Sequence, residues 1–597
     1  MNISPKGMSI LEAYNLYRKG ELIVNRKYQR KLVWAPYEKT MLIDSIMRGY
    51  PLPLFLFAKN ISTNEYKGLE ILDGVQRLTA IFDFIENRIA WEEKRFDLNV
   101  FPSANENRKN GIFKVNPNIE SLEVQDPKVS SEFLNYQLAV TTFESISEES
   151  MIDVFGRINS QGRQLSLQEK RQAGVINEFS EMVREIAEML RGDASRDILC
   201  LYDMPEISLD DSRTASGYKV SIEDMFWYQV GVLGRPHIRN SEDEEIIADL
   251  LCSIILDRPF EVSRENLDSL YDENSKLYHS VIINLKRISS EKIKRDFLKV
   301  FEVVRSALSE KIDGQNFRAV VSGQTRNAVK YSFYAVFMAM YRLIIKERMV
   351  PKDEKEIIHQ LKGLQSRLVQ GRHSVKEEDR KDNISVVNGL IRDLFILDEN
   401  HRVEKLGTEY EFETILSLAK TETEAFEFKQ GLYSISPKGI RFNPIVIEKV
   451  LKTAVAMANR ASKNTSYIFI GIADNEQDAN WVQENLKEDY LTVSQKYIVG
   501  IDGEINAVRE DLDSYIRRFV SEVDKHNVTE AIKSQVKLFN IRQYRGKQVI
   551  EIAINTPADV SMFENEIYIR EGSNTNKIDA SKSLEKVLEV GKRFGNK

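Results

Sequence analysis

Apolar residues recur at different spacings in three stretches of the chain. In roughly the first 145 residues, short apolar runs alternate with polar turns, which predicts a mixture of strands and helices. Strands are predicted at 23–30, at 52–57 and just before Asp73, and Pro36 marks the first turn of a helix. From about 146 to 400, apolar residues fall at three- and four-residue steps, which predicts a region built mostly of helices.

A different pattern begins near residue 405. Phe426 and Phe428 alternate with Glu427 and Lys429, and the nearly continuous apolar runs at 467–473 and 549–554 are typical of buried strands. The complete pattern predicts a multidomain α+β protein. Its predicted parts are an α+β domain at 1–145, an α-helical region at 146–400 and a second α+β domain at 405–597.

The composition limits the classes of protein to consider. A chain of 597 residues is too long for one hydrophobic core, and its apolar fraction of 42% and charged fraction of 29% are typical of a soluble globular protein. Two cysteines, the lack of a signal-peptide pattern and the lack of a long apolar run predict a cytoplasmic protein that does not enter a membrane. The net charge of −7 does not indicate a nucleic-acid binder, but local basic strips decide that property more than the total does.

The first candidate site is a sharp turn from a strand into a helix. Asp73 ends the predicted strand, Gly74 permits a tight turn, and a helix begins near Gln76. The unpaired N–H groups at a helix start bind phosphate readily, and Arg77 can fork onto phosphate oxygens. Asp73 suits a divalent ion or a ribose hydroxyl. An ordinary strand–turn–helix junction capped by Asp73 fits the same residues, so the turn alone does not decide the function.

Three motifs that occur in order favour the nucleotide interpretation. They are Tyr28-Gln29-Arg30-x-x-Val33-Trp34, the segment 42–53, and Asp73-Gly74-Val75-Gln76-Arg77. Together they resemble the ParB/sulfiredoxin-like domain at the N-terminus of GmrSD-type modification-dependent restriction enzymes, over about residues 8–175. In that family the turn usually reads D-G-Q-Q-R, and it binds and hydrolyses a nucleoside triphosphate. The resemblance implies a nucleotide site made of Gln29, Arg30, Asp73, Gly74, Gln76 and Arg77, and the departure at Val75 bears on hydrolysis more than on binding.

A further family-like segment, Phe155-Gly156-Arg157-Ile158-Asn159-Ser160-Gln161-Gly162, opens the helical region. The resemblance implies that Arg157 and Asn159 complete the nucleotide pocket, although both residues also fit a polar loop. Ser166 and Glu169 follow at the spacing of a helix capping box. The histidine-metal nuclease domain that often ends GmrSD-type proteins has no signature in this sequence, so any cleavage must come from another part of the chain.

The second candidate site combines carboxylates with a lysine. Glu427 and Lys429 lie two residues apart on a predicted strand and therefore share a face. Such a pair suits metal-dependent phosphodiester cleavage, in which the carboxylate holds Mg²⁺ or Mn²⁺ and the ammonium group steadies the attacking water or the developing charge. These ions need several oxygen ligands, and Glu422 and Asp474 are the candidates. A solvated strand face with a weak ion pair has the same pattern.

The segments around this site occur in a recognisable order. They are Glu422-x4-Glu427-Phe428-Lys429, 455–459, 470–474 and 568–575, and together they look like a Schlafen-type AlbA-like domain over about residues 410–590. In Schlafen nucleases the two glutamates of E-x4-E and a later aspartate form the cleavage site. The resemblance therefore implies that Glu422, Glu427 and Asp474 are catalytic and hold the metal, with Lys429 beside them. The turn at 460–466 is longer and more basic than the family's Gly-Gly turn, and many bacterial domains of this type are described only as nucleic-acid or nucleotide binders.

Basic residues near the second site are candidate contacts with a nucleic-acid backbone, because positive charge near phosphates gives affinity without reading sequence. They are Lys438, Arg441, Lys449, Lys452, Arg460 and Lys463, and then Arg542, Arg545 and Lys547. Each of them, taken singly, also fits an ordinary surface position.

The leading hypothesis is an antiphage or restriction-like effector. Its N-terminal domain binds or hydrolyses a nucleoside triphosphate, the helical region transmits the state, and the C-terminal domain cuts DNA or RNA with Mg²⁺ or Mn²⁺. The defence role rests on the resemblance alone. The alternatives are a non-cleaving nucleic-acid-binding regulator with a nucleotide-dependent clamp, and an NTPase whose C-terminal domain assembles homo-oligomers.

Overall fold

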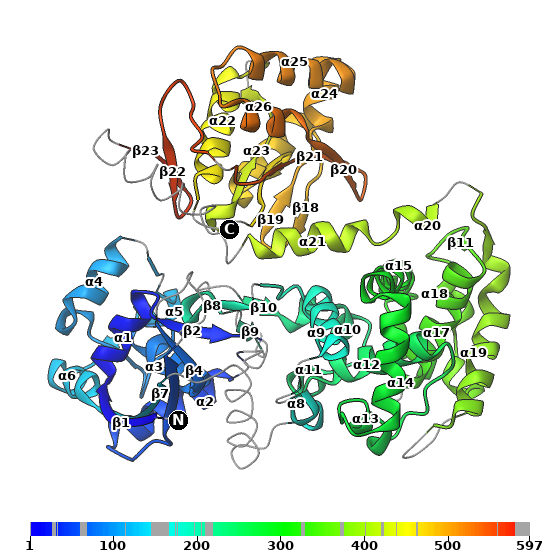
Figure 1. Ribbon diagram of the computed structural model, residues 1–597, viewed down its shortest axis with the longest axis horizontal. Helices are drawn as coiled ribbons and strands as arrows, with labels where there is room; N and C mark the ends of the chain where they lie inside the picture. The colour runs from blue at the N-terminus through cyan, green and yellow to red at the C-terminus, as the bar shows by residue number, and fades with distance from the viewer. Residues whose placement is uncertain are drawn as a thin grey trace. The chain divides into compact units, whose positions relative to one another are not determined.

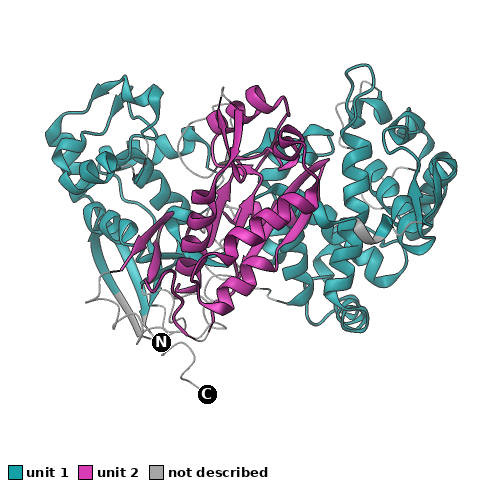
Figure 2. Ribbon diagram, turned by 90° about the horizontal axis from the view of Figure 1, so that it is seen from above, with its two compact units in different colours: residues 1–411 teal, residues 412–597 magenta. Residues whose placement is uncertain are grey.

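The chain forms two compact units, residues 1–411 and 412–597 (Figure 2). The computed structural model describes residues 2–26, 32, 34–59, 68–110, 112–113, 115–144, 166–172, 175, 177–195, 197–204, 206–208, 219–323, 329–369, 375–399, 402–419, 423–436, 439–460, 464–557 and 559–578. In these ranges no helix combines the length and the apolar character that crossing a bilayer requires. The multidomain α+β class predicted from the sequence is confirmed.

The first unit begins with a six-stranded mixed sheet of order β1-β7-β3-β4-β2-β8 (Figure 1). Its strands are β1 (Asn2–Ser9), β2 (Leu22–Asn25), β3 (Phe55–Lys59), β4 (Leu69–Asp73), β7 (Gln137–Glu144) and β8 (Ile198–Cys200). The helices α1 (Ile10–Arg18), α2 (Pro36–Met47), α3 (Val75–Ile85) and α6 (Pro127–Asn135) share one apolar core with this sheet. Strand β3 begins three residues later than predicted, after Pro53, whose ring nitrogen has no hydrogen to donate to a sheet.

The rest of the first unit is mostly helical, as predicted, and has a core of its own. Its longer helices are α9 (Glu178–Arg191), α12 (Glu242–Leu256), α14 (Lys276–Ile288), α15 (Ser290–Ser309), α17 (Lys330–Tyr341) and α19 (Glu377–Ile391). The segment 354–369 contains only the short α18 (Ile357–Gln360) and a four-residue 3₁₀ turn at Leu364–Arg367. The predicted domain boundaries at 145/146 and 400/405 stay predictions.

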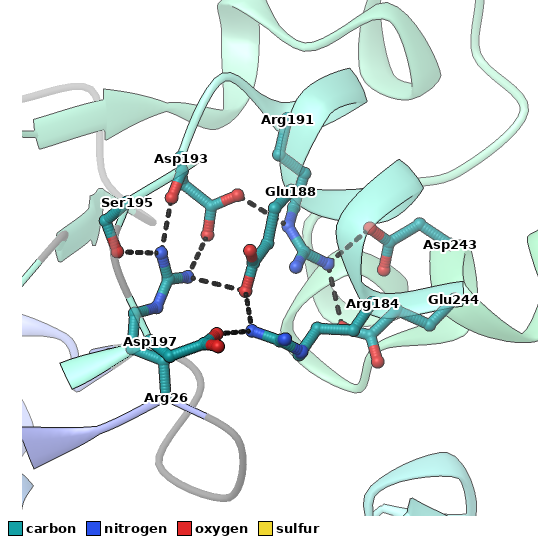
Figure 3. A network of polar contacts seen from close by, with 9 residues as sticks. All are labelled: Arg26, Arg184, Glu188, Arg191, Asp193, Ser195, Asp197, Asp243 and Glu244. Atoms are coloured by element: carbon teal, nitrogen blue, oxygen red, sulfur yellow. Dashed lines mark hydrogen bonds and ion pairs between the residues drawn. The ribbon is translucent and has the colours of Figure 1, made fainter. Parts of the chain in front are cut away.

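A buried network of ion pairs ties the end of β2 to the helical region (Figure 3). Arg26 donates to the carbonyl of Asp193 at 2.6 Å and to its carboxylate at 3.1 Å, and it pairs with Glu188 at 3.2 Å. Arg191, in the last turn of α9, pairs with Asp243 of α12 at 2.7 Å. Removing one partner of such a pair leaves a buried charge uncompensated, so the network fixes how these elements join.

The second unit is built on a four-stranded sheet of order β13-β16-β21-β20. The strands are β13 (Phe426–Lys429), β16 (Ser466–Ile470), β20 (Asn540–Tyr544) and β21 (Lys547–Ile554), and only the pair β13–β16 is parallel. The helices α22 (Pro444–Ala458), α25 (Leu512–Asp524) and α26 (Glu530–Lys537) pack against the face that carries Ile468 and Ile470. The opposite face carries Phe428 and Phe469 and is covered by Phe412 of α21 (Thr408–Leu418).

Two small hairpins and a small sheet flank the central sheet. They are β14 (Tyr433–Ser436) with β15 (Gly439–Phe442), β22 (Tyr568–Glu571) with β23 (Asn574–Lys577), and β17 (Ile472–Ala473) with β18 (Leu491–Val493) and β19 (Lys496–Ile498). The strand predicted at 467–473 is interrupted at Gly471, whose φ is +107°. The chain therefore leaves the central sheet there and continues in a different sheet, which places Asp474 at the end of β17.

Candidate functional site

The strand-to-helix turn of the first unit has the predicted geometry with one difference. Asp73 is the last residue of β4, and α3 begins at Val75 after Gly74, which has a φ of +109°. Gly74, and not Asp73, is the residue at the helix cap, and no side chain caps this helix start. The positive end of the α3 dipole therefore meets the turn without a capping side chain from Gly74, as at helix starts that bind anions.

The guanidinium group of Arg77 is committed to the turn itself. It donates to Asp73 Oδ2 at 2.8 Å, to the carbonyl of Leu54 at 3.1 Å and to the carbonyl of Pro53, and it lies 4.3 Å from the ring centroid of Phe55. Burial lowers the pKa of Arg77, and the neighbouring Asp73 opposes that shift. In this arrangement Arg77 holds Asp73 in place and has few donors left for a phosphate.

The other predicted nucleotide residues are only partly described. Gln76 Oε1 accepts from the backbone N–H of Trp34 at 3.3 Å, which ties the turn to the residues just before α2. Gln29, Arg30, Arg157 and Asn159 lie outside the described residues. The capping box predicted at Ser166 and Glu169 is confirmed, because each side chain accepts from the other residue's backbone N–H, at 3.2 and 2.9 Å.

In the second unit, Glu427 and Lys429 lie on the same face of β13 and form an ion pair. Their register partners on β16 are Ile468 and Ile470, so both side chains lie on the face that α22 covers. Arg570 of β22 donates to Glu427 Oε2 at 2.9 Å and to the carbonyl of Phe426 at 2.9 Å. Glu427 is therefore held between two cations, one of which is 143 residues away in the chain.

A basic pocket surrounds this carboxylate. It has a volume of about 230 Å³ and is lined by Glu427, Lys429, Lys449, Lys452, Thr453, Arg570, Ser573, Asn574 and Thr575. We call these nine residues the basic pocket. Its four cations outnumber its single carboxylate, and Lys449 is exposed on α22. A surplus of positive charge in a concave site attracts phosphate groups.

A second, polar pocket lies beside the first and shares Lys429 with it. It has a volume of about 440 Å³, and its polar lining is Lys429, Gln430, Ser434, Asn443, Asp474 and Asp478. Asp474 is exposed, with 53% of its side chain accessible, and pairs with Lys496 at 2.6 Å. Lys496 itself lies 4.3 Å from the ring centroid of Phe428, which points to the opposite face of β13 from Glu427. The two carboxylates thus have different partners and line different pockets.

Comparison with known families identifies both ends of the chain. Residues 10–176 match the family described as the N-terminal domain of the GmrSD restriction endonuclease, and residues 422–579 match the family described as Schlafen, AlbA_2. The chain joins a GmrSD N-terminal domain to a Schlafen AlbA_2 domain. No curated protein and no solved structure matches the chain.

The carboxylates of the AlbA_2 domain do not make a metal site by themselves in the described residues. No group of three His, Cys, Asp or Glu side chains there is arranged to hold a metal ion. Both oxygens of Glu427 already face a cation, Lys429 on one side and Arg570 on the other. Glu422, the remaining predicted ligand, lies outside the described residues, so its metal role stays a prediction.

The predicted nucleic-acid contacts of the AlbA_2 domain lie in different environments. Lys449 and Lys452 line the basic pocket, and Arg441 is exposed on β15. Arg460 is buried and donates to Ser466 Oγ at 2.7 Å, which places it beneath the surface. Pairing with a carboxylate occupies three more, since Arg542 contacts Glu551, Arg545 contacts Glu413 and Lys547 contacts Glu488. Lys438 and Lys463 lie outside the described residues, and all these roles stay predictions.

Sequence reasoning missed Arg570 as part of the site. It belongs to a segment that resembles the family, but nothing in its neighbours along the chain shows that it reaches Glu427. The only available signal was its position in the segment 568–575, close to residues that also line the basic pocket.

A buried carboxyl in the AlbA_2 domain predicts how stability depends on pH. Burial raises the pKa of Glu504 to about 7, although Tyr515 and the backbone N–H groups of Leu432 and Tyr433 donate to it. Because the folded pKa lies above the usual value of about 4.3, its stabilising contribution is complete below that value and is lost as pH rises through about 7.

We therefore expect the unfolding free energy of the native chain to fall, relative to that of Glu504→Gln, as pH rises from about 4.3 to about 7. Chemical denaturation of both proteins at several pH values measures the difference. Comparing the two proteins removes the effect of Glu302, whose pKa burial also raises to about 7. A difference that does not change with pH would contradict the raised pKa of Glu504.

Proposed function

We propose that this chain is a nucleotide-regulated nuclease of the restriction type that acts in defence against foreign nucleic acid. The GmrSD N-terminal domain binds a nucleoside triphosphate at the turn from Asp73 to Arg77. The AlbA_2 domain binds a nucleic-acid backbone in the basic pocket and cleaves it with Mg²⁺ or Mn²⁺. The two family matches support the nuclease and defence parts of this proposal.

The observation that carries the proposal is the basic pocket. Four cations from three separate elements, β13, α22 and β22, converge there around one carboxylate. Phosphate groups are the most common anions that such sites bind, and affinity of this kind needs no particular base sequence. The chain has an overall charge of −7, so a local cluster of this size does not follow from the composition.

The nucleotide part of the proposal rests on the start of α3. Gly74 lets the strand turn directly into the helix without a capping side chain, and the positive end of the helix dipole suits phosphate oxygens. Asp73 is 35% accessible and held by Arg77, so it can accept a ribose hydroxyl or contact a nucleotide-bound cation. A nucleotide bound here regulates the nuclease, because an unregulated nuclease would damage the cell that makes it.

One observation favours a second function, that of a nucleic-acid-binding regulator that does not cleave. The ion pairs of Glu427 with Lys429 and Arg570 leave this carboxylate neutralised, whereas a metal ligand must offer its oxygens to the ion. Cleavage by Glu422, Glu427 and Asp474 is therefore the part of the proposal that most needs a direct test.

A cleavage assay on a panel of substrates tests the proposal. The full chain is incubated with modified and unmodified DNA, tRNA and total RNA, with Mg²⁺ or Mn²⁺ and with each nucleoside triphosphate or none. We expect cleavage that a chelator abolishes and that a nucleotide changes, and we expect Asp73→Asn to remove the nucleotide effect without removing the cleavage. Binding without cleavage under every condition would overturn the nuclease in favour of the regulator, and the absence of both would overturn the two functions together.

A further inference from the structure

The polar pocket of the second unit restricts which nucleic acids the proposed function can act on, whereas the basic pocket does not. Its volume of about 440 Å³ lies in the usual range of about 300–1,000 Å³ for sites that enclose a small organic group. The basic pocket beside it, at about 230 Å³, concentrates cations. Lys429 lines both, so a ligand that fills one is adjacent to the other.

The chemistry of the polar pocket differs from that of the basic pocket. Amide and hydroxyl groups come from Gln430, Ser434 and Asn443, carboxylates come from Asp474 and Asp478, and Ile472 contributes an apolar wall. This mixture of donors and acceptors beside an apolar surface matches the edge and the faces of a nucleobase. It suits a phosphate less well than the basic pocket does, because Asp474, although paired with Lys496, and Asp478 place two carboxylates beside the single lining cation Lys429.

We infer that the two pockets together hold one nucleotide of a single-stranded nucleic acid, with its phosphate in the basic pocket and its base in the polar pocket. The inference rests on the proposed function and narrows its substrate class. A base in a duplex is stacked and paired, and it reaches a pocket only by leaving the helix, which costs a few kcal/mol. A single strand avoids that cost, so the paired pockets select against a duplex.

Gln430 and Lys449 each line only one of the two pockets, so substitutions at these residues test the pockets separately. Gln430 lies directly after β13 and lines only the polar pocket, whereas Lys449 lies on α22 and lines only the basic pocket. Neither side chain has a hydrogen bond or ion pair among the described residues. Gln430 is thus placed to contact a base, and Lys449 is placed to contact a phosphate.

Binding of labelled oligonucleotides to the full chain tests the inference. Fluorescence anisotropy at fixed salt compares a single strand of DNA, the same strand of RNA, the duplex, and a strand of equal length in which every base is replaced by an abasic residue. We expect the single strand to bind at least about tenfold more tightly than the duplex or the abasic strand, which corresponds to about 1.4 kcal/mol. The DNA and RNA strands together show whether the sugar contributes.

Two variants assign the pockets. We expect Gln430→Ala to reduce the preference for the normal strand over the abasic strand, and Lys449→Ala to weaken all ligands alike and lower the salt dependence by about one phosphate contact. Lys525→Ala, an exposed lysine that lines neither pocket, is the control and should change nothing.

The outcomes separate this inference from the proposed function. One outcome is equal affinity for the single strand, the duplex and the abasic strand, with Lys449→Ala still weakening the binding of all three. This outcome would overturn the assignment of a base to the polar pocket and leave backbone binding in the basic pocket in place. Unchanged affinity in Lys449→Ala, or no binding of any oligonucleotide, would overturn the basic pocket and with it both proposals.

Discussion

Replacing Glu427 with glutamine is expected to abolish cleavage and at the same time to strengthen nucleic-acid binding. The amide oxygen of glutamine can still accept from Arg570, which donates to Glu427 at 2.9 Å, so the contact between β22 and β13 is kept. The negative charge is lost, and with it the ability to act as an anionic metal ligand. Removing a group of this kind from a catalytic site typically lowers the rate about 10²–10⁴-fold.

The gain in binding distinguishes this role from a purely structural one. Among the described residues, Glu427 is the only carboxylate that lines the basic pocket. Its removal leaves Lys429 and Arg570 without their shared partner, whereas Lys452 keeps its ion pair with Glu448. A misfolded variant would lose both cleavage and binding, whereas the expected variant loses one and gains in the other. Cleavage rates and anisotropy titrations on the same protein preparation measure both effects.

Glu484→Gln provides the matched control for this experiment. Glu484 is an exposed glutamate on α23 (Glu476–Leu486) that lines neither the basic nor the polar pocket. It should leave cleavage and binding unchanged. If Glu427→Gln cleaves at the native rate, then Glu427 is not a catalytic carboxylate, and the cutting site lies elsewhere or does not exist.

Local patterns in the sequence predicted the faces of strands and the starts of helices well. The alternation at 426–429 placed Glu427 and Lys429 on one face, and the structure shows them paired there. The capping box at Ser166 and Glu169 is present because it depends on residues only three apart. Such features follow from the fixed geometry of a single element, so the sequence alone is enough to find them.

The partners of the candidate site residues could not be predicted in the same way. Arg570 reaches Glu427 because a hairpin formed 143 residues later packs beside β13, and no local spacing encodes that contact. The sequence predicts that Arg77 contacts a phosphate, but the carbonyl groups before β3 and the ring of Phe55 hold its guanidinium group. These contacts depend on how distant elements pack, which a single sequence does not state.

Gly471 shows how one backbone angle changes the position of a predicted site residue. The apolar run at 467–473 predicts one buried strand with Asp474 at its end. The φ of +107° at Gly471 ends β16, and β17 pairs with β19 instead. Asp474 consequently faces Lys496, and its distance from the predicted metal ligands is set by the small sheet and not by β13.

The second large effect is expected from Gly74→Ala in the GmrSD N-terminal domain. The φ of +109° at this position is one that residues with a Cβ atom rarely adopt, and a Cβ built there would lie 2.4 Å from Cδ1 of Phe55. Phe55 is fully buried and supports the guanidinium group of Arg77 on its ring, so it cannot move away without disturbing the turn. Strain and overpacking together predict a loss of about 3 kcal/mol or more in the unfolding free energy, and a loss of nucleotide binding.

Gly49→Ala separates the two causes, because Gly49 has a φ of +71° but nothing within 4 Å of the position of a Cβ. It carries backbone strain without the clash, and that strain is smaller because a φ of +71° lies close to the left-handed region that residues with a Cβ sometimes adopt, so we expect a loss of about 1 kcal/mol. Chemical denaturation of both variants measures the difference, and calorimetric titration with nucleoside triphosphates measures the effect on the site. Equal losses in the two variants would show that Phe55 does not restrict the turn.

A double variant tests whether the clash with Phe55 is the main cost of Gly74→Ala. If the clash with Phe55 is the main cost of Gly74→Ala, then Gly74→Ala should cost less stability in a Phe55→Leu background than in the native chain. Phe55→Leu by itself also removes buried apolar area. The coupling energy of this double-mutant cycle is then expected to be favourable, on the order of 1 kcal/mol or more. Nucleotide binding that stays lost while stability returns would mean that the turn needs the bare backbone of Gly74 for its ligand, and that the residue serves the phosphate site as well as the fold.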